Sequence, residues 1–321
     1  MRLRILFAVI GVAVAAAASA QDYPVKPIRM VVPWPPAGGT DIVARLIAAK
    51  MTDAWRIQVV VDNRSGATGT IGTNLVARAT PDGYTLLLGT NATHAIAVNL
   101  IPNLPYDQEK DLTPIARVAS VPHILSVNPA LPVHTVAELI ALAKARPGKI
   151  AFGSAGYGST PHLGGELFKI VTGVNLLHVP YKGTGQSLQD TLGGMVSVSF
   201  DTMPSVIGYI KSGMLRPLAV MGPRRVPVLP EVPTIAEAGA SGAEQVTWYG
   251  LFGPGGLPSH IVRKLHGEIV KIVQLPDVKA RFETLGVDET AGASLEEFAA
   301  MLKADVAKYA KVVNAAGLKN E

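Results

Sequence analysis

Residues 28–54, IRMVVPWPPAGGTDIVARLIAAKMTDA, contain the unit that decides the fold. The apolar run Ile28–Val32 is typical of a buried strand, and from Asp41 to Ala54 apolar residues recur at helical spacing. A segment rich in Pro and Gly separates the two patterns and ends both of them. The stretch therefore predicts a strand, a turn and a helix, which together form the repeating unit of an α/β fold.

The same alternation continues along the chain. Further strands are expected at residues 58–62, 85–89, 124–127, 150–153, 196–200, 218–221 and 249–252. Further helices are expected at residues 69–79, 136–145, 161–172, 186–193 and 295–316. Continuous apolar strands separated by helices indicate mostly parallel sheets flanked by helices, and the lack of a fixed-period repeat excludes solenoids and propellers.

Eight strands with their helices, over about 300 residues, exceed the usual size of a single hydrophobic core. We therefore expect two lobes, each with its own sheet. Lobe 1 combines residues 21–121 with residues 222–321, and lobe 2 is formed by residues 122–221. The chain is expected to cross between the lobes near Ala119–Pro122 and again near Met221–Pro223.

The N-terminus has the three regions of a secretory signal peptide. Met1–Arg4 is basic, Ile5–Ala18 is apolar, and Ala18-Ser19-Ala20 is a small-residue cleavage site. The apolar run of about 14 residues is shorter than the ~20 that a spanning helix needs. The sequence thus predicts an exported protein cleaved after Ala20, and the lack of cysteine fits a bacterial periplasm at least as well as an animal secretory route.

Composition excludes several kinds of chemistry. The chain has no cysteine, which excludes disulfides, thiol nucleophiles and Cys-ligated metals. The net charge of +5 becomes +3 once Arg2 and Arg4 leave with the signal peptide, and the remaining Lys and Arg are scattered, which argues against nucleic acid as a partner. Neither a dinucleotide fingerprint nor a phosphate loop is present, and the seven histidines form no metal motif. We expect no cofactor and no metal.

Five segments are rich in glycine or in small hydroxyl residues, and four of them directly follow predicted strands. They are residues 33–41, 63–70, 90–94, 154–161 and 181–185. In open parallel sheets, ligands bind beyond the carboxyl ends of the strands, where helices begin. Backbone N–H groups at helix starts, supplemented by hydroxyls, form a receptor for an anion.

These motifs also resemble a known family. The segment from Pro33-Trp34-Pro35-Pro36 through Ala37-Gly38-Gly39-Thr40-Asp41 is similar to the opening signature of the TctC/Bug family, the periplasmic solute-binding receptors of tripartite tricarboxylate transporters. The further matches are VDNR at 61–64, PDGYTL at 81–86, LPYD at 104–107, VPYKG at 179–183, LGG at 192–194, FD at 200–201 and the Leu-Pro and Pro-Thr pairs within 229–234, followed by EAG at 237–239. The resemblance covers essentially all of the mature chain. Ala37 and Ser65 depart from the family, which often has Gly and Pro at these positions.

The resemblance implies a type II-like two-lobed periplasmic binding protein without enzymatic activity. It would act as a monomer, close on a small carboxylate and deliver it to the permease subunits of its transporter. Amino acids, di- and tricarboxylates and aromatic carboxylates are all compatible with the family. The ligand-binding residues implied by the resemblance are Trp34, Gly38, Gly39, Thr40, Asp41, Thr90, Asn91, His94, Ser154, Ser159, Thr160, Tyr181 and Asp201.

Two alternatives remain open at this stage. One is an exported serine hydrolase of small esters or amides, with Ser154 or Ser159 as nucleophile and His162 or His94 as base. The G-x-S-x-G elbow that such enzymes use is missing, because Gly153 directly precedes Ser154. The other is a permanently docked partner subunit that binds no ligand.

Overall fold

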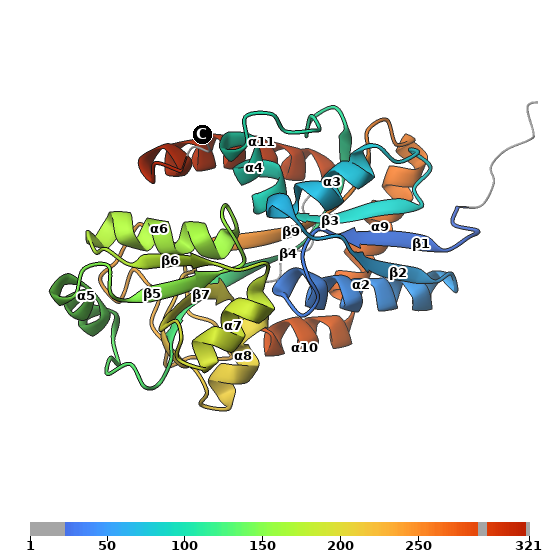
Figure 1. Ribbon diagram of the computed structural model, residues 1–321. Helices are drawn as coiled ribbons and strands as arrows, with labels where there is room; N and C mark the ends of the chain where they lie inside the picture. The colour runs from blue at the N-terminus through green and yellow to red at the C-terminus, as the bar shows by residue number, and fades with distance from the viewer. Residues whose placement is uncertain (1–22, 288–293, 319–321) are drawn as a thin grey trace, which may run out of the picture.

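The computed structural model describes residues 23–287 and 294–318 (Figure 1). The expected signal peptide, residues 1–20, lies outside these ranges. Within them, no helix combines the length and the apolar character needed to cross a membrane.

Strands and helices alternate along most of the chain. The strands are β1 (Ile28–Val32), β2 (Val59–Asn63), β3 (Thr85–Thr90), β4 (Leu112–Val127), β5 (Ala151–Ser154), β6 (Leu177–Pro180), β7 (Val198–Thr202), β8 (Arg216–Val220) and β9 (Val246–Pro254). The helices are α2 (Gly39–Trp55), α3 (Thr70–Ala77), α4 (Ala97–Leu100), α5 (Val136–Ala145), α6 (Thr160–Thr172), α7 (Thr184–Leu192), α8 (Met203–Lys211), α9 (Ser259–Gln274), α10 (Pro276–Thr284) and α11 (Leu295–Ala315). Two short turns complete the set, the 3₁₀ turn η1 (Ala67–Gly69) and the π-helical turn η2 (Ala92–Ile96).

The strands form two sheets that share β4. In the first sheet the order is β2-β1-β3-β9-β4, and in the second it is β6-β5-β7-β4-β8. In Figure 1 the first sheet lies on the right with α2, α3 and α9, and the second lies on the left with α5, α6, α7 and α8. The α/β class with two lobes is therefore confirmed. Among the named strands of the described residues, the parallel pairs lie within β1–β3 and β5–β7, and every pair that involves β4 or β9 is antiparallel. One isolated parallel bridge joins Val220 to Thr234.

β4 differs most from its prediction, since the expected strand 124–127 is only the end of a strand of 16 residues. As far as Pro122 it pairs with β9, and from His123 onward it pairs with β7, β8 or both. Pro114 and Pro122 lie inside it and remove two backbone donors, which is why the sequence pattern hides its first part.

Three segments of backbone are joined where β4 passes from one sheet to the other. The His123 N–H donates to the Gln245 carbonyl at 3.0 Å, the Gln245 N–H to the Met221 carbonyl at 2.8 Å, and the Met221 N–H to the His123 carbonyl at 2.8 Å. The lobe boundaries at 121 and 221 stay a prediction. Beyond residue 221, the chain returns to the core of the second sheet with Ile235, Ala240 and Ala243.

The two sheets are covered by separate apolar clusters. Ile28 and Met30 of β1 pack with Ile47 and Met51 of α2 in the larger cluster. Phe152, Phe168 and Phe200 belong to the cluster of the second sheet. These clusters fix the strand ends and the helix starts against one another.

Besides the short α4 and η2, four elements were not expected from the sequence, namely β6, α8, α9 and α10. β6 has only four residues and no buried side chain, so it lacks an apolar pattern. α8 contains Pro204 and Gly208, which weaken a helical prediction. α9 does have an apolar stripe, with Ile261, Leu265 and Ile269 buried, and this signal could have been recognised.

Candidate functional site: a pocket between the two sheets

A pocket lies where the two halves of the molecule meet, and we call it the cleft pocket. Its volume, open side included, is about 440 Å³, which is within the range of small-molecule sites. It is lined by Trp34, Pro35, Gly38, Gly39, Thr40, Thr90, Ala155, Ser159, Thr160, Pro161, Thr184, Thr202, Thr247 and Tyr249. These residues come from β1–β3 and their loops, from the helix starts of the second sheet and from β9.

Four helices begin at this pocket. Gly39 opens α2, Thr160 opens α6, Thr184 opens α7, and Thr202 is the N-cap of α8. The N-caps of α2, α7 and α8 make no side-chain hydrogen bond to the first turn, so backbone N–H groups there have no capping partner. Uncapped N–H groups at the positive ends of helix dipoles form a binding site for an anion.

Hydroxyl groups dominate the lining of the cleft pocket. Eight of the lining residues carry a hydroxyl, and among the described residues none that lines it is Lys, Arg, His, Asp or Glu. The pocket thus offers neutral donors and no counter-charge. An anion bound here would be held by dipoles aimed at it, with no buried cation to desolvate.

The hydrogen bonds behind the pocket decide which hydroxyls can donate into it. His123 Nδ1 lies 2.7 Å from the Phe200 carbonyl, which only accepts, so a neutral His123 ring carries its proton on Nδ1. His123 Nε2, 2.7 Å from Thr247 Oγ1, then accepts the Thr247 proton. Burial lowers the pKa of His123 to about 4, which keeps the ring neutral. Thr247 therefore presents only lone pairs to the pocket.

The hydroxyl protons of Thr184 and Ser159 are also used in hydrogen bonds within the protein. Thr184 Oγ1 donates to Asp201 Oδ1 at 3.2 Å, and Ser159 Oγ donates to the Gly156 carbonyl at 2.6 Å. In contrast, the Tyr249 hydroxyl is buried and has no partner of ordinary hydrogen-bond geometry among the described residues. Its neighbour is the Thr202 hydroxyl, so the Tyr249 proton is not committed to the backbone and lies beside the pocket.

Asp201 lies directly behind the pocket and is fully buried. Burial raises the pKa of Asp201 to about 6, although Ser199 and Thr184 both donate to its carboxylate. It is joined to the pocket wall through Thr184, and its charge state therefore affects any anion bound beyond that hydroxyl.

A second, wider space adjoins the cleft pocket, and we call it the outer cavity. Its volume, open side included, is about 1290 Å³, and it shares Trp34 and Ala155 with the cleft pocket. Tyr181 and Lys182 line it. The Tyr181 hydroxyl donates to Asp190 Oδ2 at 2.7 Å. A larger ligand could extend from the cleft pocket into this space.

Seven of the thirteen expected ligand-binding residues line the cleft pocket. They are Trp34, Gly38, Gly39, Thr40, Thr90, Ser159 and Thr160. Six do not line it, namely Asp41, Asn91, His94, Ser154, Tyr181 and Asp201.

Asp41 and Asn91 bond to neighbouring parts of the fold. Asp41 Oδ2 accepts from the Ala37 N–H at 3.0 Å and so fixes the turn before α2. Asn91 Nδ2 donates to the Val246 carbonyl at 3.0 Å and to the Tyr309 hydroxyl.

Comparison with known proteins identifies the family. The model of the tripartite tricarboxylate transporter family receptor, TctC, matches residues 43–318. The chain belongs to this family. Protein BugT of Bordetella pertussis is 38% identical over 325 residues, which is 99% of each chain.

Two solved structures are close to this receptor. R. palustris Rpa4515 with adipate has a TM-score of 0.89 and 38% identity, and the match covers 92% of this chain and 99% of that one. MatC (Rpa3494) from Rhodopseudomonas palustris with bound malate has a TM-score of 0.85 and 32% identity, and the match covers 91% of this chain and 100% of that one. The family is one of solute-binding receptors and not of enzymes, which confirms that this chain is not an enzyme.

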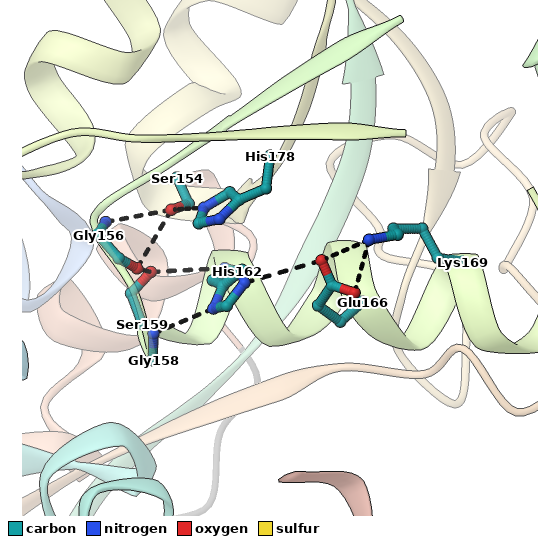
Figure 2. Close-up of polar contacts among 8 residues, drawn as sticks. All are labelled: Ser154, Gly156, Gly158, Ser159, His162, Glu166, Lys169 and His178. Atoms are coloured by element: carbon teal, nitrogen blue, oxygen red, sulfur yellow. Dashed lines mark hydrogen bonds and ion pairs between the residues drawn. The ribbon is translucent and has the colours of Figure 1, made fainter. Parts of the chain in front are cut away.

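Both hydroxyls that the hydrolase alternative considered, those of Ser154 and Ser159, lie in a hydrogen-bonded network of this receptor (Figure 2). Ser154 Oγ is 2.7 Å from His178 Nε2, so neither His162 nor His94 is its partner. It also accepts from the Gly156 N–H at 3.1 Å, and Ser154 has no exposed surface. Ser154 therefore supports the loop before α6.

The histidine below this loop is equally engaged. His162 stacks on His178 at 3.9 Å between ring centroids, and its Nδ1 accepts from the Gly158 N–H at 3.0 Å. Burial lowers the pKa of His162 to about 3, and the neighbouring His178 contributes a smaller shift in the same direction. Glu166 lies 3.7 Å from His162 Nε2 and pairs with Lys169 on the solvent side (Figure 2). Within the described residues, no group of three His, Asp or Glu side chains is arranged to hold a metal ion.

Some residues that line the pocket were not singled out from the sequence. They are Pro35, Ala155, Pro161, Thr184, Thr202, Thr247 and Tyr249. Thr184 had a signal, because it lies in the glycine-rich segment 181–185, and so had Thr202, because it closely follows the expected strand 196–200. Thr247 and Tyr249 had none, since they reach the pocket only through the antiparallel path of β9.

Proposed function

We propose that this chain is a periplasmic receptor that captures a small carboxylate between its two lobes. The observation that carries the proposal is the set of three uncapped helix starts, α2, α7 and α8, at one pocket lined by hydroxyls. The adipate and malate bound to Rpa4515 and MatC support a small carboxylate as ligand.

In this proposal the ligand carboxylate lies against the first turn of α2. Gly39 lets the Thr202 and Tyr249 hydroxyls lie close to this turn, because a Cβ there would be 2.5 Å from both of them. Among the lining hydroxyls of the described residues, those of Thr40, Thr90, Thr160 and Tyr249 donate no hydrogen bond of ordinary geometry and so have protons to give. A hydrogen bond to a charged group contributes ~1.5–3 kcal/mol, so a few such bonds account for tight binding without an arginine.

The experiment is a thermal-shift screen of the mature protein against mono-, di- and tricarboxylates, with adipate and malate among them. A ligand at a hundredfold excess over its Kd adds ~2.7 kcal/mol, which raises the Tm by several degrees. Hydrolysis of p-nitrophenyl acetate is measured in parallel. If no carboxylate raises the Tm while the ester is turned over, the proposal is wrong.

Lobe closure and export belong to the same proposal. Groups from both halves line the pocket, so a ligand that contacts both favours the closed form. Small-angle scattering should then give a smaller radius of gyration with the ligand than without it. Export is tested by the mass of the protein from a periplasmic fraction, which should correspond to a chain beginning at Gln21. Delivery to membrane subunits of a tripartite tricarboxylate transporter is tested by loss of uptake when this receptor is deleted.

A further inference from the structure

A second pocket lies in the half of the molecule that contains β1–β3 and shares no lining residue with the cleft pocket. It is bounded by the start of β4, by α11 and by η2, and its volume, open side included, is about 680 Å³. Leu112, Leu302 and Val306 contribute apolar walls. We call it the second pocket.

The floor of the second pocket contains buried polar atoms without partners. His94 is 3% exposed and lines the pocket, and its Nε2 has no hydrogen-bond partner among the described residues. Gln108 lines the same pocket, and its Oε1 is likewise buried without a partner in the described part of the chain. A buried polar atom left unpaired in this way costs free energy unless something binds to it.

The hydrogen bonds of His94 fix what its Nε2 can do. The Thr93 hydroxyl donates its one proton to the Thr90 carbonyl at 2.9 Å, and it lies 2.8 Å from His94 Nδ1. Nδ1 must therefore supply the proton of that second bond. Nε2 is left as an acceptor, and burial, which lowers the pKa of His94 to about 3, keeps the ring neutral.

The surrounding residues hold His94 in this orientation. Its ring stacks on Phe252 with 3.8 Å between centroids, at an angle of 18°. Gly89 makes room for it, because a Cβ there would lie 2.5 Å from His94 Cε1. The acceptor is thus rigidly placed at the base of an apolar pocket.

The charges at the second pocket are balanced. Lys303 and Glu109 are the charged residues among its lining and carry opposite signs. Such a pocket has no preference for an anion, unlike the cleft pocket. Apolar walls with acceptors at the base suit an uncharged molecule that carries a donor.

We propose that the second pocket binds a small uncharged molecule with an apolar body and one hydroxyl or N–H group, which donates to His94 Nε2. The probe pair is phenol and anisole, which share the aromatic body but differ in the donor. Calorimetric titration of the mature protein should show phenol binding about tenfold more tightly than anisole, as one added hydrogen bond predicts. The ¹⁵N shift of His94 Nε2 should move with phenol and not with anisole.

Two variants locate the binding. His94→Phe keeps a ring on Phe252 but removes the acceptor, so phenol and anisole should bind it equally. Leu302→Trp fills the pocket and should abolish binding of both probes. His260→Phe changes an exposed histidine of α9 and serves as the matched control, with wild-type binding expected. Equal affinities of the wild type for the two probes, or phenol binding unchanged in Leu302→Trp, overturn the proposal. If His94→Phe fails to fold, Leu302→Trp and the comparison of phenol with anisole still test whether the second pocket binds such a molecule.

Discussion

Three of the four helix starts at the cleft pocket, those of α2, α7 and α8, differ from the capped helix starts of α5 and α11. Thr135 caps α5 by accepting from the Glu138 N–H, and Ser294 and Glu297 form a reciprocal capping box on α11. α2 and α7 begin with glycine at the N-cap and have no such bond. Capping stabilises a helix by ~1 kcal/mol, so a pocket that leaves its helices uncapped gives up stability. The comparison suggests that these N–H groups are kept available for a ligand.

The largest effect is expected from acid, which should lower the stability of the fold through three buried histidines. His94, His123 and His162 are almost fully buried, and burial holds the pKa of each at about 3 to 4. Between pH 6.5 and pH 4 the unfolded chain binds protons that the folded chain does not, so stability falls as the pH falls. The loss at pH 5 is roughly 2 kcal/mol for each histidine.

Asp201 works in the opposite direction, because its folded pKa of about 6 lies above its unfolded value, and it returns roughly 1 kcal/mol at pH 5. Urea unfolding at pH 7 and pH 5 measures the net change. His123→Gln should unfold at lower urea than the wild type at pH 7 but lose less on acidification. His260→Gln is the control, and an equal loss in all three proteins would contradict this account.

The next largest effect is expected at Gly39. In Gly39→Ala the new methyl group meets Thr202 Oγ1 and the Tyr249 hydroxyl, each 2.5 Å from the ideal Cβ position. It occupies the space beside the uncapped N–H groups of α2, so binding of adipate, or of the acid that ranks first in the thermal-shift screen, should weaken by roughly a hundredfold or more.

Gly208→Ala in α8 is the matched control, because a Cβ there has nothing within 4 Å. It should bind with wild-type affinity in calorimetric titration. Wild-type affinity in Gly39→Ala as well would show that the ligand does not use the start of α2.

A smaller effect tests the capping comparison directly. Gly38 has φ −80° and ψ 166°, which serine adopts freely, so Gly38→Ser adds a cap to α2. The serine hydroxyl competes with the ligand for the same N–H groups, and we expect affinity to fall about three- to tenfold with no loss of stability.

Ser294→Ala removes the capping box of α11 and should have the opposite pattern of effects from Gly38→Ser, with stability reduced and affinity nearly unchanged. Unfolding free energy should fall by ~1 kcal/mol while affinity changes by less than twofold. The comparison fails if the two variants affect binding alike in calorimetric titration.

The smallest effect concerns the pH dependence of binding. Above pH 6 Asp201 becomes charged behind Thr184 and repels an anion in the pocket, so affinity should fall severalfold between pH 5 and pH 8. Asp201→Asn should bind with nearly the same affinity at both pH values. A slope that survives in Asp201→Asn would assign the pH dependence to another group.

The sequence predicted most of the parallel parts of the fold. β1, β2, β3, β5 and β7 lie within about two residues of their expected ranges, because continuous apolar runs between turn residues are a strong local signal. The antiparallel connections could not be predicted in the same way. The first part of β4 mixes proline, polar and apolar residues, and the start of β9 mixes polar and apolar ones, so only their neighbours in space make them strands.

The candidate site was predictable to a similar degree. Loops at strand ends, such as Gly38–Thr40 and Ser159–Thr160, bring their residues to the pocket because helix starts converge there. The local sequence does not show whether a polar side chain in such a loop points toward a ligand or forms hydrogen bonds within the protein. Asp41 and Ser154 both belong to such loops, yet each bonds to the backbone of its own turn.

β4 passes from one sheet into the other as a single strand, held on both edges by backbone hydrogen bonds at the point of passage. A change in the angle between the two halves must therefore bend this strand, because no free loop there can absorb the rotation. Such a connection bends along its length and does not rotate freely about a single point. In the proposed closure of the two lobes, the bending of β4 is therefore part of the conformational change.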